Sequence, residues 1–192
     1  VIIVSVAVVL APCSYPFLRK HQRDRIDALV AQVMGDTRVN DGIGFQSSRA
    51  VTLAGAGGLS GTGKDEAGTL IRFNRLPEEH TDMVFAVACC RWGFLGGVAI
   101  WALGTLYAFG AFMVALRAGT MFGRLVAVGI GAMVFLQFLV NSAMTIGLLP
   151  VTGMTLPFVS YGGSSLVALW ATTGVLFAIA SRRARGFDLD GN

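Results

Sequence analysis

The residues best suited to chemistry in this chain lie together in one short stretch, RLPEEHTDMVFAVACC, from Arg75 to Cys90. Its first half supplies charged and hydroxyl side chains, and Asp82 lies where the apolar second half begins. An ionised carboxylate is costly close to hydrocarbon, so ionisable residues in such places often mark functional sites. One interpretation of Asp82 is a carboxylate held at the bilayer surface beside an amphiphilic substrate. The structural alternative is a helix N-cap with Thr81 nearby, and these residues alone leave both open.

A second unusual stretch is GLLPVTGMTLPFVSYGGSSL, from Gly147 to Leu166, which combines prolines, glycines and hydroxyl side chains without any charge. Irregular backbone at membrane depth is tolerated only where it is buried in protein or lines a cavity. Ser164 or Ser165 could cap the helix that follows. We therefore expect a functional loop here, with a simple connection between two spans as the alternative.

The composition indicates the elements that must position these two stretches. Of the 192 residues, 54% are hydrophobic and 14% charged, whereas soluble domains have about a quarter charged residues. No charged residue occurs from Leu125 to Ser181, which is long enough for two spans of about 20 residues and a connection. The sequence therefore predicts an all-α integral membrane protein. Its net charge of +4 is dispersed and does not suggest a nucleic-acid partner.

The apolar pattern predicts a polytopic helical bundle with one long polar loop. The first segment resembles the end of a span, so we expect a C-terminal part of a larger membrane protein. The segment 83–116 could form one long helix, two short helices, or a surface helix followed by a span. The predicted elements are a partial span at 1–12, a loop at 13–82, a surface helix plus span at 83–116, a span at 125–149, a loop at 150–165, a span at 166–181 and a tail at 182–192.

The basic residues near the span ends predict the orientation. Arg117 and Arg124 flank one short connection, and Arg182, Arg183 and Arg185 follow the last span. Such residues concentrate on the cytoplasmic side. The loop at 150–165 should then be extracytoplasmic. If segment 83–116 crosses the membrane once, the loop that carries Asp82 is extracytoplasmic too, whereas two crossings would place Asp82 inside.

Three further motifs have ordinary structural interpretations. The stretch GLSGTGKD (Gly58–Asp65) nearly matches a phosphate-binding loop, but Asp65 replaces the required hydroxyl residue, so we expect a turn-rich loop in which Lys64 could face an anion. The spacing in RIDALVAQVM (Arg25–Met34) predicts a helix on the membrane surface or on other protein. The stretch GFLGG (Gly93–Gly97) predicts close packing between helices.

Four stretches together resemble one family, the FtsW/RodA/SpoVE group of SEDS proteins. They are HQRDRI (His21–Ile26), FQSSRAVTLAGAGGLSGTG (Phe45–Gly63), LPEEHTDMVFAV (Leu76–Val87) and GLLPVTGMTLPFVSYGGSS (Gly147–Ser165), in the family's order. The resemblance covers nearly the whole chain. It implies the C-terminal part of a bundle of roughly ten membrane-spanning helices, with the Asp82 loop outside the cytoplasm.

The resemblance also implies an activity and its residues. Such proteins are peptidoglycan glycosyltransferases of the bacterial cytoplasmic membrane that polymerise lipid II on its outer face. They work with a class B penicillin-binding transpeptidase and with other membrane proteins of the divisome or elongasome. Asp82 occupies the position of the family's essential carboxylate, as general base or as ligand of a divalent ion, Mg²⁺ or Mn²⁺; no tightly bound cofactor is expected. The candidate substrate-binding residues are Glu78, His80, Thr81, Lys64, Arg72, Arg75, Ser160, Tyr161, Ser164 and Ser165.

The sequence departs from the family pattern near this carboxylate. Asn74 replaces a common acidic residue, Met83 a common aromatic one, and Cys89, Cys90 and Arg91 replace a frequent acidic pair. These differences indicate a divergent member that retains Asp82.

Two other functions fit the same resemblance. A lipid II flippase would need a polar path through the bundle, for which the visible spans offer Gln137, Asn141, Ser142 and Thr145. Such residues also bond helix to helix. A non-catalytic scaffold for the transpeptidase is the third interpretation.

Overall fold

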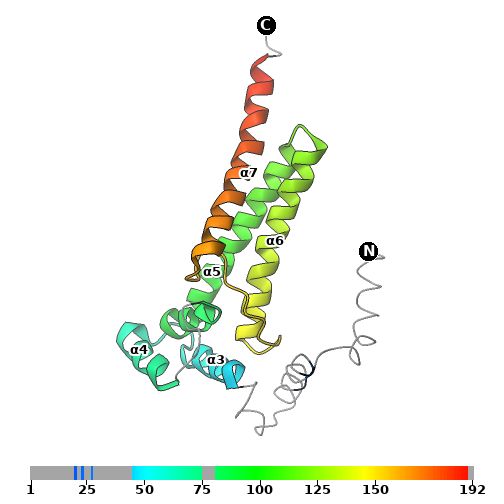
Figure 1. Ribbon diagram of the computed structural model, residues 1–192. Coiled ribbons are helices and arrows are strands. Elements are labelled where there is room, and N and C mark those ends of the chain that lie inside the picture. Colours follow the sequence, from blue (N-terminus) through cyan, green and yellow to red (C-terminus); the bar gives the residue numbers. More distant parts are fainter. Residues whose placement is uncertain (1–19, 21–22, 24–26, 28–44, 75–80, 190–192) are drawn as a thin grey trace.

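The computed structural model describes residues 20, 23, 27, 45–74 and 81–189 (Figure 1). Its elements are all helices, which confirms the predicted all-α class. The predicted partial span at 1–12 lies outside the described residues, as does the predicted helix at 25–34 apart from Asp27. The helices are α3 (Phe45–Ala56), α4 (Gly63–Asn74), α5 (Val84–Arg117), α6 (Met121–Thr145) and α7 (Gly163–Leu189).

Three helices, α5, α6 and α7, are long and apolar enough to cross a membrane. They run alongside one another, and α3 and α4 lie together at one end of this bundle (Figure 1). Many large apolar side chains on them are exposed, such as Leu103 at 68% and Phe177 at 72%. Outward-facing apolar residues of this kind suit lipid or neighbouring helices, so the predicted membrane class is confirmed.

The spans begin and end at other residues than the sequence predicted. Helix α6 begins at Met121 instead of residue 125, because the Thr120 side chain caps it by accepting a hydrogen bond from the Gly123 amide at 3.1 Å. It ends at Thr145 instead of residue 149, and Gly147 follows with a φ of 79°. A positive φ suits glycine and interrupts a helix.

The last span also starts earlier than predicted, at Gly163 instead of residue 166. The carbonyl of Gly162 accepts the first helical hydrogen bond, from the Leu166 amide at 2.9 Å. Ser165 donates its hydroxyl hydrogen to that same carbonyl at 3.0 Å. The prediction that Ser164 or Ser165 caps this helix is therefore wrong, since both lie inside its first turn.

Helix α5 is divided at Gly93, whose φ of 69° and ψ of −163° are not helical. A short helix precedes this break, and the 24 residues from Phe94 to Arg117 follow it. At 1.5 Å per residue the second part is about 36 Å long, which is enough to cross the hydrocarbon core. The break excludes one uninterrupted helix over 83–116, and the place of the short first part at a membrane surface stays a prediction.

The glycine-rich turn at residues 57–62 docks onto the break in α5. The Phe94 amide donates to the carbonyl of Gly58 at 2.8 Å, and the Thr62 amide donates to that of Cys90 at 3.0 Å. A Cβ atom at Gly93 would lie 2.4 Å from the amide nitrogen of Gly61. The prediction that Gly93 serves helix–helix packing is therefore wrong: it allows a turn to approach the interrupted helix and satisfy its free backbone groups.

The predicted long loop is more ordered than expected, because α3 and α4 both lie within it. Ala50 and Leu53 of α3 are fully buried against Met83, Ala86 and Cys90 at the start of α5. This small core, which also includes Ala67 of α4, packs both helices of the predicted loop against the helix that follows Asp82.

Candidate functional site

Asp82 lies in a turn just before α5. The N-cap position of that helix is Met83, which has no side chain able to accept a capping hydrogen bond and makes none. The structure thus assigns the N-cap position to Met83 and places Asp82 one residue before it. Asp82 and Thr81 are both half-buried.

Two buried side chains from distant elements donate hydrogen bonds to the backbone at Asp82. The hydroxyl of Ser160 donates to the carbonyl of Thr81 at 2.5 Å. The amide nitrogen Nδ2 of Asn141 donates to the carbonyl of Asp82 at 2.8 Å. Ser160 is 3% exposed and Asn141 is fully buried. The turn before α5 is thus tied both to α6 and to the uncharged loop.

The same two side chains hold the uncharged loop in place. Asn141 Nδ2 also donates to the carbonyl of Met154 at 2.6 Å, and Ser160 Oγ accepts from the amide of Leu156 at 2.7 Å. Gly153 has a φ of 73°, and a Cβ atom there would lie 3.4 Å from Oδ2 of Asp82. The two unusual stretches of the sequence therefore meet at Asp82.

The uncharged loop enters the bundle instead of spanning its surface. Phe158 has a φ of 63°, which is rare for a bulky residue, so it must be held by its surroundings. Its ring lies 5.2 Å from that of Tyr107 on α5 and 5.8 Å from that of Trp170 on α7. Pro157 beside it is fully buried. The middle of the irregular stretch is thus enclosed by protein, whereas Thr152, Gly153 and Tyr161 are exposed.

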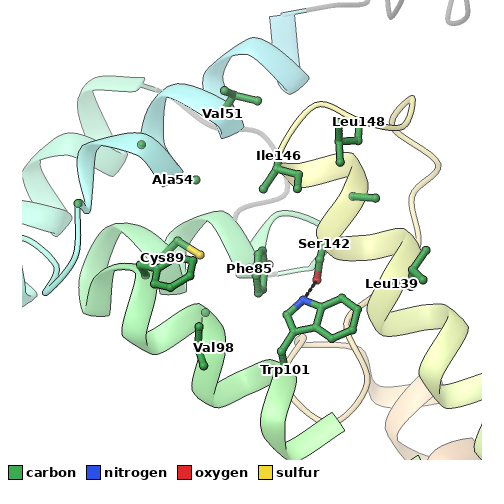
Figure 2. A pocket seen from close by; sticks show the side chains of 15 residues that line it. Val51, Ala54, Phe85, Cys89, Val98, Trp101, Leu139, Ser142, Ile146 and Leu148 are labelled. Carbon is green, nitrogen blue, oxygen red and sulfur yellow. Dashed lines mark hydrogen bonds between the residues drawn. The ribbon is translucent and has the colours of Figure 1, made fainter. Parts of the chain in front are cut away.

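An apolar cavity of about 810 Å³ lies between α3, the start of α5 and the end of α6 (Figure 2). Phe85, one helical turn beyond Asp82, projects toward it, and the Trp101 indole donates to Ser142 Oγ at 3.0 Å on one side. Its apolar lining suits an aliphatic chain. Its lining residues are Val51, Ala54, Gly55, Gly58, Phe85, Cys89, Phe94, Gly97, Val98, Trp101, Leu139, Ser142, Ala143, Ile146 and Leu148.

The other predicted site residues are distributed around this centre. Tyr161 is 81% exposed, Ser164 is exposed and Ser165 half-buried, all near the start of α7. Lys64 and Arg72 are exposed on α4. Glu78, His80 and Arg75 lie outside the described residues, so their roles stay predictions.

Among the predicted path residues of α6, three make internal hydrogen bonds. Asn141 holds Asp82 and Met154, Ser142 accepts from Trp101, and Thr145 Oγ1 donates to the carbonyl of Asn141 at 2.6 Å. These contacts join helices and loops, which is the ordinary use of polar residues in a bundle.

Asp82 is a candidate metal ligand, but the described residues contain no group of three or more His, Cys, Asp or Glu side chains suited to a metal. Mg²⁺ is usually held by one or two carboxylates together with substrate phosphates and water. One carboxylate next to a phosphorylated substrate fits that pattern, whereas a site made of protein ligands alone does not fit the described part of the chain.

Comparison with known proteins agrees with this geometry. Residues 1–185 match the profile of the FtsW/RodA/SpoVE family, described as cell cycle proteins. The chain belongs to this family. It is 40% identical over 139 residues to Stage V sporulation protein E of Bacillus subtilis (strain 168), covering 72% of this chain and 37% of that protein.

Other members of the FtsW/RodA/SpoVE family are similar over more of the chain. Peptidoglycan glycosyltransferase MrdB of Escherichia coli (strain K12) is 36% identical over 186 residues, covering 94% of this chain and 49% of that protein. A solved chain from a peptidoglycan synthase complex, studied for the coordination of polymerization and crosslinking, superposes with a TM-score of 0.72 at 29% identity. That match covers 94% of this chain and 48% of the solved one. The chain spans at most about half the length of these relatives.

Proposed function

We propose that this chain is the C-terminal part of a peptidoglycan glycosyltransferase that polymerises lipid II, with Asp82 as its reacting carboxylate. The observation that carries the proposal is the meeting of two distant sequence stretches at Asp82. Ser160 and Asn141 bond its flanking carbonyls, and Gly153 approaches its carboxylate. Relatives named peptidoglycan glycosyltransferase support the reaction class.

The chemistry requires a base at the membrane surface. The hydroxyl oxygen of an acceptor sugar attacks the anomeric carbon of the donor, and the bond from that carbon to the lipid diphosphate breaks. The hydroxyl proton passes to Asp82 as general base, and the lipid diphosphate leaves with the bonding electron pair. Asp82 lies in the turn before the short first part of α5, and the membrane-length part of that helix begins after the break at Gly93. A substrate anchored by its lipid would present its sugar at this end of the bundle.

The surroundings of Asp82 suit both ends of an amphiphilic substrate. The apolar cavity beside Phe85 would take part of the lipid chain. Lys64, Arg72 and Arg75 are proposed to steady the diphosphate, with Glu78, His80, Thr81, Tyr161, Ser164 and Ser165 as further substrate contacts. In the alternative role, Asp82 together with the substrate would hold a divalent ion, Mg²⁺ or Mn²⁺, that would stabilise the leaving diphosphate.

The arrangement of the helices supports the proposed orientation. The connection between α5 and α6, flanked by Arg117 and Arg124, lies at the same end of the bundle as the C-terminal end of α7 (Figure 1). Asp82, α3 and α4 belong to the opposite end. Since basic residues favour the cytoplasmic side, we place Asp82 on the outer face of the bacterial cytoplasmic membrane.

The proposed partner is a class B penicillin-binding transpeptidase, with other divisome or elongasome proteins around it. The similarity to a chain of a peptidoglycan synthase complex supports a synthase assembly. A flippase has less support, because Asn141, Ser142 and Thr145 make internal hydrogen bonds.

The test uses the full-length protein, purified with its transpeptidase partner and given labelled lipid II. We expect long glycan strands from the wild type and none from Asp82→Ala at equal expression. Equal polymer from both proteins would remove Asp82 from the site. Absence of polymer from both would favour the transporter or the scaffold.

A further inference from the structure

We propose that Ser160 and Asn141 are positioning residues that aim the Asp82 carboxylate at the reacting sugars. This inference rests on the proposed function, in which Asp82 is the general base. It gives Ser160 a different task from the predicted contact with substrate, and it gives Asn141 a task that the sequence pattern did not suggest.

The two hydrogen bonds act on the two peptide planes that meet at Asp82. The carbonyl of Thr81 belongs to the plane before the Asp82 Cα atom, and the carbonyl of Asp82 belongs to the plane after it. Ser160 holds the first at 2.5 Å and Asn141 holds the second at 2.8 Å. Peptide planes are rigid, so fixing both sets φ and ψ of Asp82. The direction of the Asp82 Cα–Cβ bond is then fixed by two residues that lie outside the turn before α5.

The hydroxyl of Ser160 already makes two hydrogen bonds within the protein. It donates its one hydrogen to Thr81 and accepts from the amide of Leu156 at 2.7 Å. A hydroxyl has one donor, so none remains for a substrate oxygen. Its 3% exposure also keeps it from direct contact with a sugar.

The amide of Asn141 can face these carbonyls in one way only. Both of its close partners, the carbonyls of Asp82 and Met154, accept hydrogen bonds, so the nitrogen must point at them. Its Oδ1 atom is buried and has no hydrogen-bond partner among the described residues. An unpaired buried acceptor is unfavourable. A position that required packing alone would suit Leu better, so the two donated hydrogen bonds are the reason for an Asn.

The test compares three variants of the full-length protein with its transpeptidase partner. Ser160→Ala removes one hydroxyl, and Asn141→Asp keeps the side-chain shape while replacing the amide donor. Thr173→Val is the matched control, because it removes a partly buried hydroxyl that bonds Tyr107 at 2.9 Å, between α5 and α7. The readouts are membrane accumulation, and kcat and KM for lipid II.

We expect Ser160→Ala and Asn141→Asp to lower kcat by about 10- to 100-fold, because a small displacement of a reacting group has effects of this size. The KM should stay within about twofold, since no substrate contact is lost. Thr173→Val should keep both constants near wild type. A normal kcat in both variants, or a loss confined to KM, would overturn the proposal. If Asn141→Asp fails to accumulate, the smaller change at Ser160 decides.

A second background separates positioning from general destabilisation. Asp82→Glu keeps a carboxylate but moves it, so the hydrogen bonds from Ser160 and Asn141 should no longer aim it correctly. In that background, Ser160→Ala should lower kcat little further. Full multiplication of the two losses would contradict action through Asp82. The proposed function fails separately, if Asp82→Ala retains polymerisation. If Asp82→Ala is inactive while Ser160→Ala and Asn141→Asp have normal kcat, only the positioning inference fails.

Discussion

The two ends of the helix bundle are connected in opposite ways. At one end, the three residues Ala118–Thr120 join α5 to α6, and the Thr120 side chain caps α6. At the other end, an uncharged irregular loop between α6 and α7 enters the bundle and contacts the turn at Asp82. Simple connection of two helices needs only the first arrangement.

The difference shows where the chain departs from regular structure. The Asp82 end combines a broken helix at Gly93, a positive φ at Phe158 and buried side-chain hydrogen bonds to the backbone. Strained or irregular backbone persists when its surroundings hold it, and it clusters at functional sites. At the opposite end, Arg117 and Arg124 lie on the helices that flank a short, ordinary connection. We therefore propose that the Asp82 end carries the reacting groups, and that the opposite end serves to connect and orient the helices.

The largest effect is expected at the helix break. Gly93→Ala would place a Cβ atom 2.4 Å from the Gly61 amide nitrogen at a positive φ, so the turn at 57–62 must move. We expect a loss of more than about 2 kcal/mol in the free energy of unfolding, and poor membrane accumulation. Gly110→Ala in the same helix meets nothing within 4 Å and should accumulate normally. Quantitative blotting of membranes distinguishes them, and equal amounts would contradict the docking role of Gly93.

A smaller effect, on turnover, is expected at Gly153. Its φ of 73° disfavours a side chain, and a Cβ atom would lie 3.4 Å from the Asp82 carboxylate. Gly153→Ala should lower lipid II turnover by about 10-fold or more, by displacing the loop from Asp82. Gly119→Ala, in the connection at the opposite end, has open space around it and should leave turnover unchanged. If turnover is equal in both variants, the loop does not shape the site.

An effect on substrate affinity is expected at Gly55, which lines the apolar cavity and has nothing within 4 Å of a Cβ position. Gly55→Leu should narrow the cavity and raise the KM for lipid II several-fold with little change in kcat. Because Gly is unfavourable in a helix by about 1 kcal/mol, the thermal stability should hold or rise. An unchanged KM would mean that the cavity takes no part of the substrate.

The smallest effect is expected at the opposite end. Thr120→Ala removes the cap of α6, in which the Thr120 hydroxyl accepts from Gly123. The free energy of unfolding should fall by about 1 kcal/mol. Lipid II turnover should stay at the wild-type value, as measured on equal amounts of protein. A large loss of turnover would contradict the claim that this end takes no part in the reaction.

Much of the fold could be predicted from the sequence, because the absence of charge over residues 125–181 and the length of the apolar runs determine the spans. The span ends could not, since they depend on single contacts such as the Thr120 cap. The two helices in the long loop were missed because their apolar residues are sparse. Their stability comes from packing Ala50 and Leu53 of α3 and Ala67 of α4 against the start of α5.

The candidate site was predicted in part. The unusual composition of two stretches identified Asp82 and the loop around Ser160, and family resemblance suggested their roles. Asn141 and Gly153 were not recognised as neighbours of Asp82. Asn141 acts through hydrogen bonds to distant backbone carbonyls and Gly153 through its approach to the Asp82 carboxylate, and no spacing in the sequence encodes such tertiary contacts. The assumed helix packing at Gly93 failed for the same reason, because its partner is a distant turn.

The most direct test of the central claim compares two carboxylates in the same predicted outer region. Asp82 contacts the uncharged loop, whereas Asp65 is exposed in the first turn of α4. Lipid II turnover would be measured for full-length Asp82→Asn and Asp65→Asn, each with the transpeptidase partner. We predict no measurable turnover for Asp82→Asn and wild-type turnover for Asp65→Asn. Wild-type turnover by Asp82→Asn would contradict the assignment of chemistry to this end of the bundle.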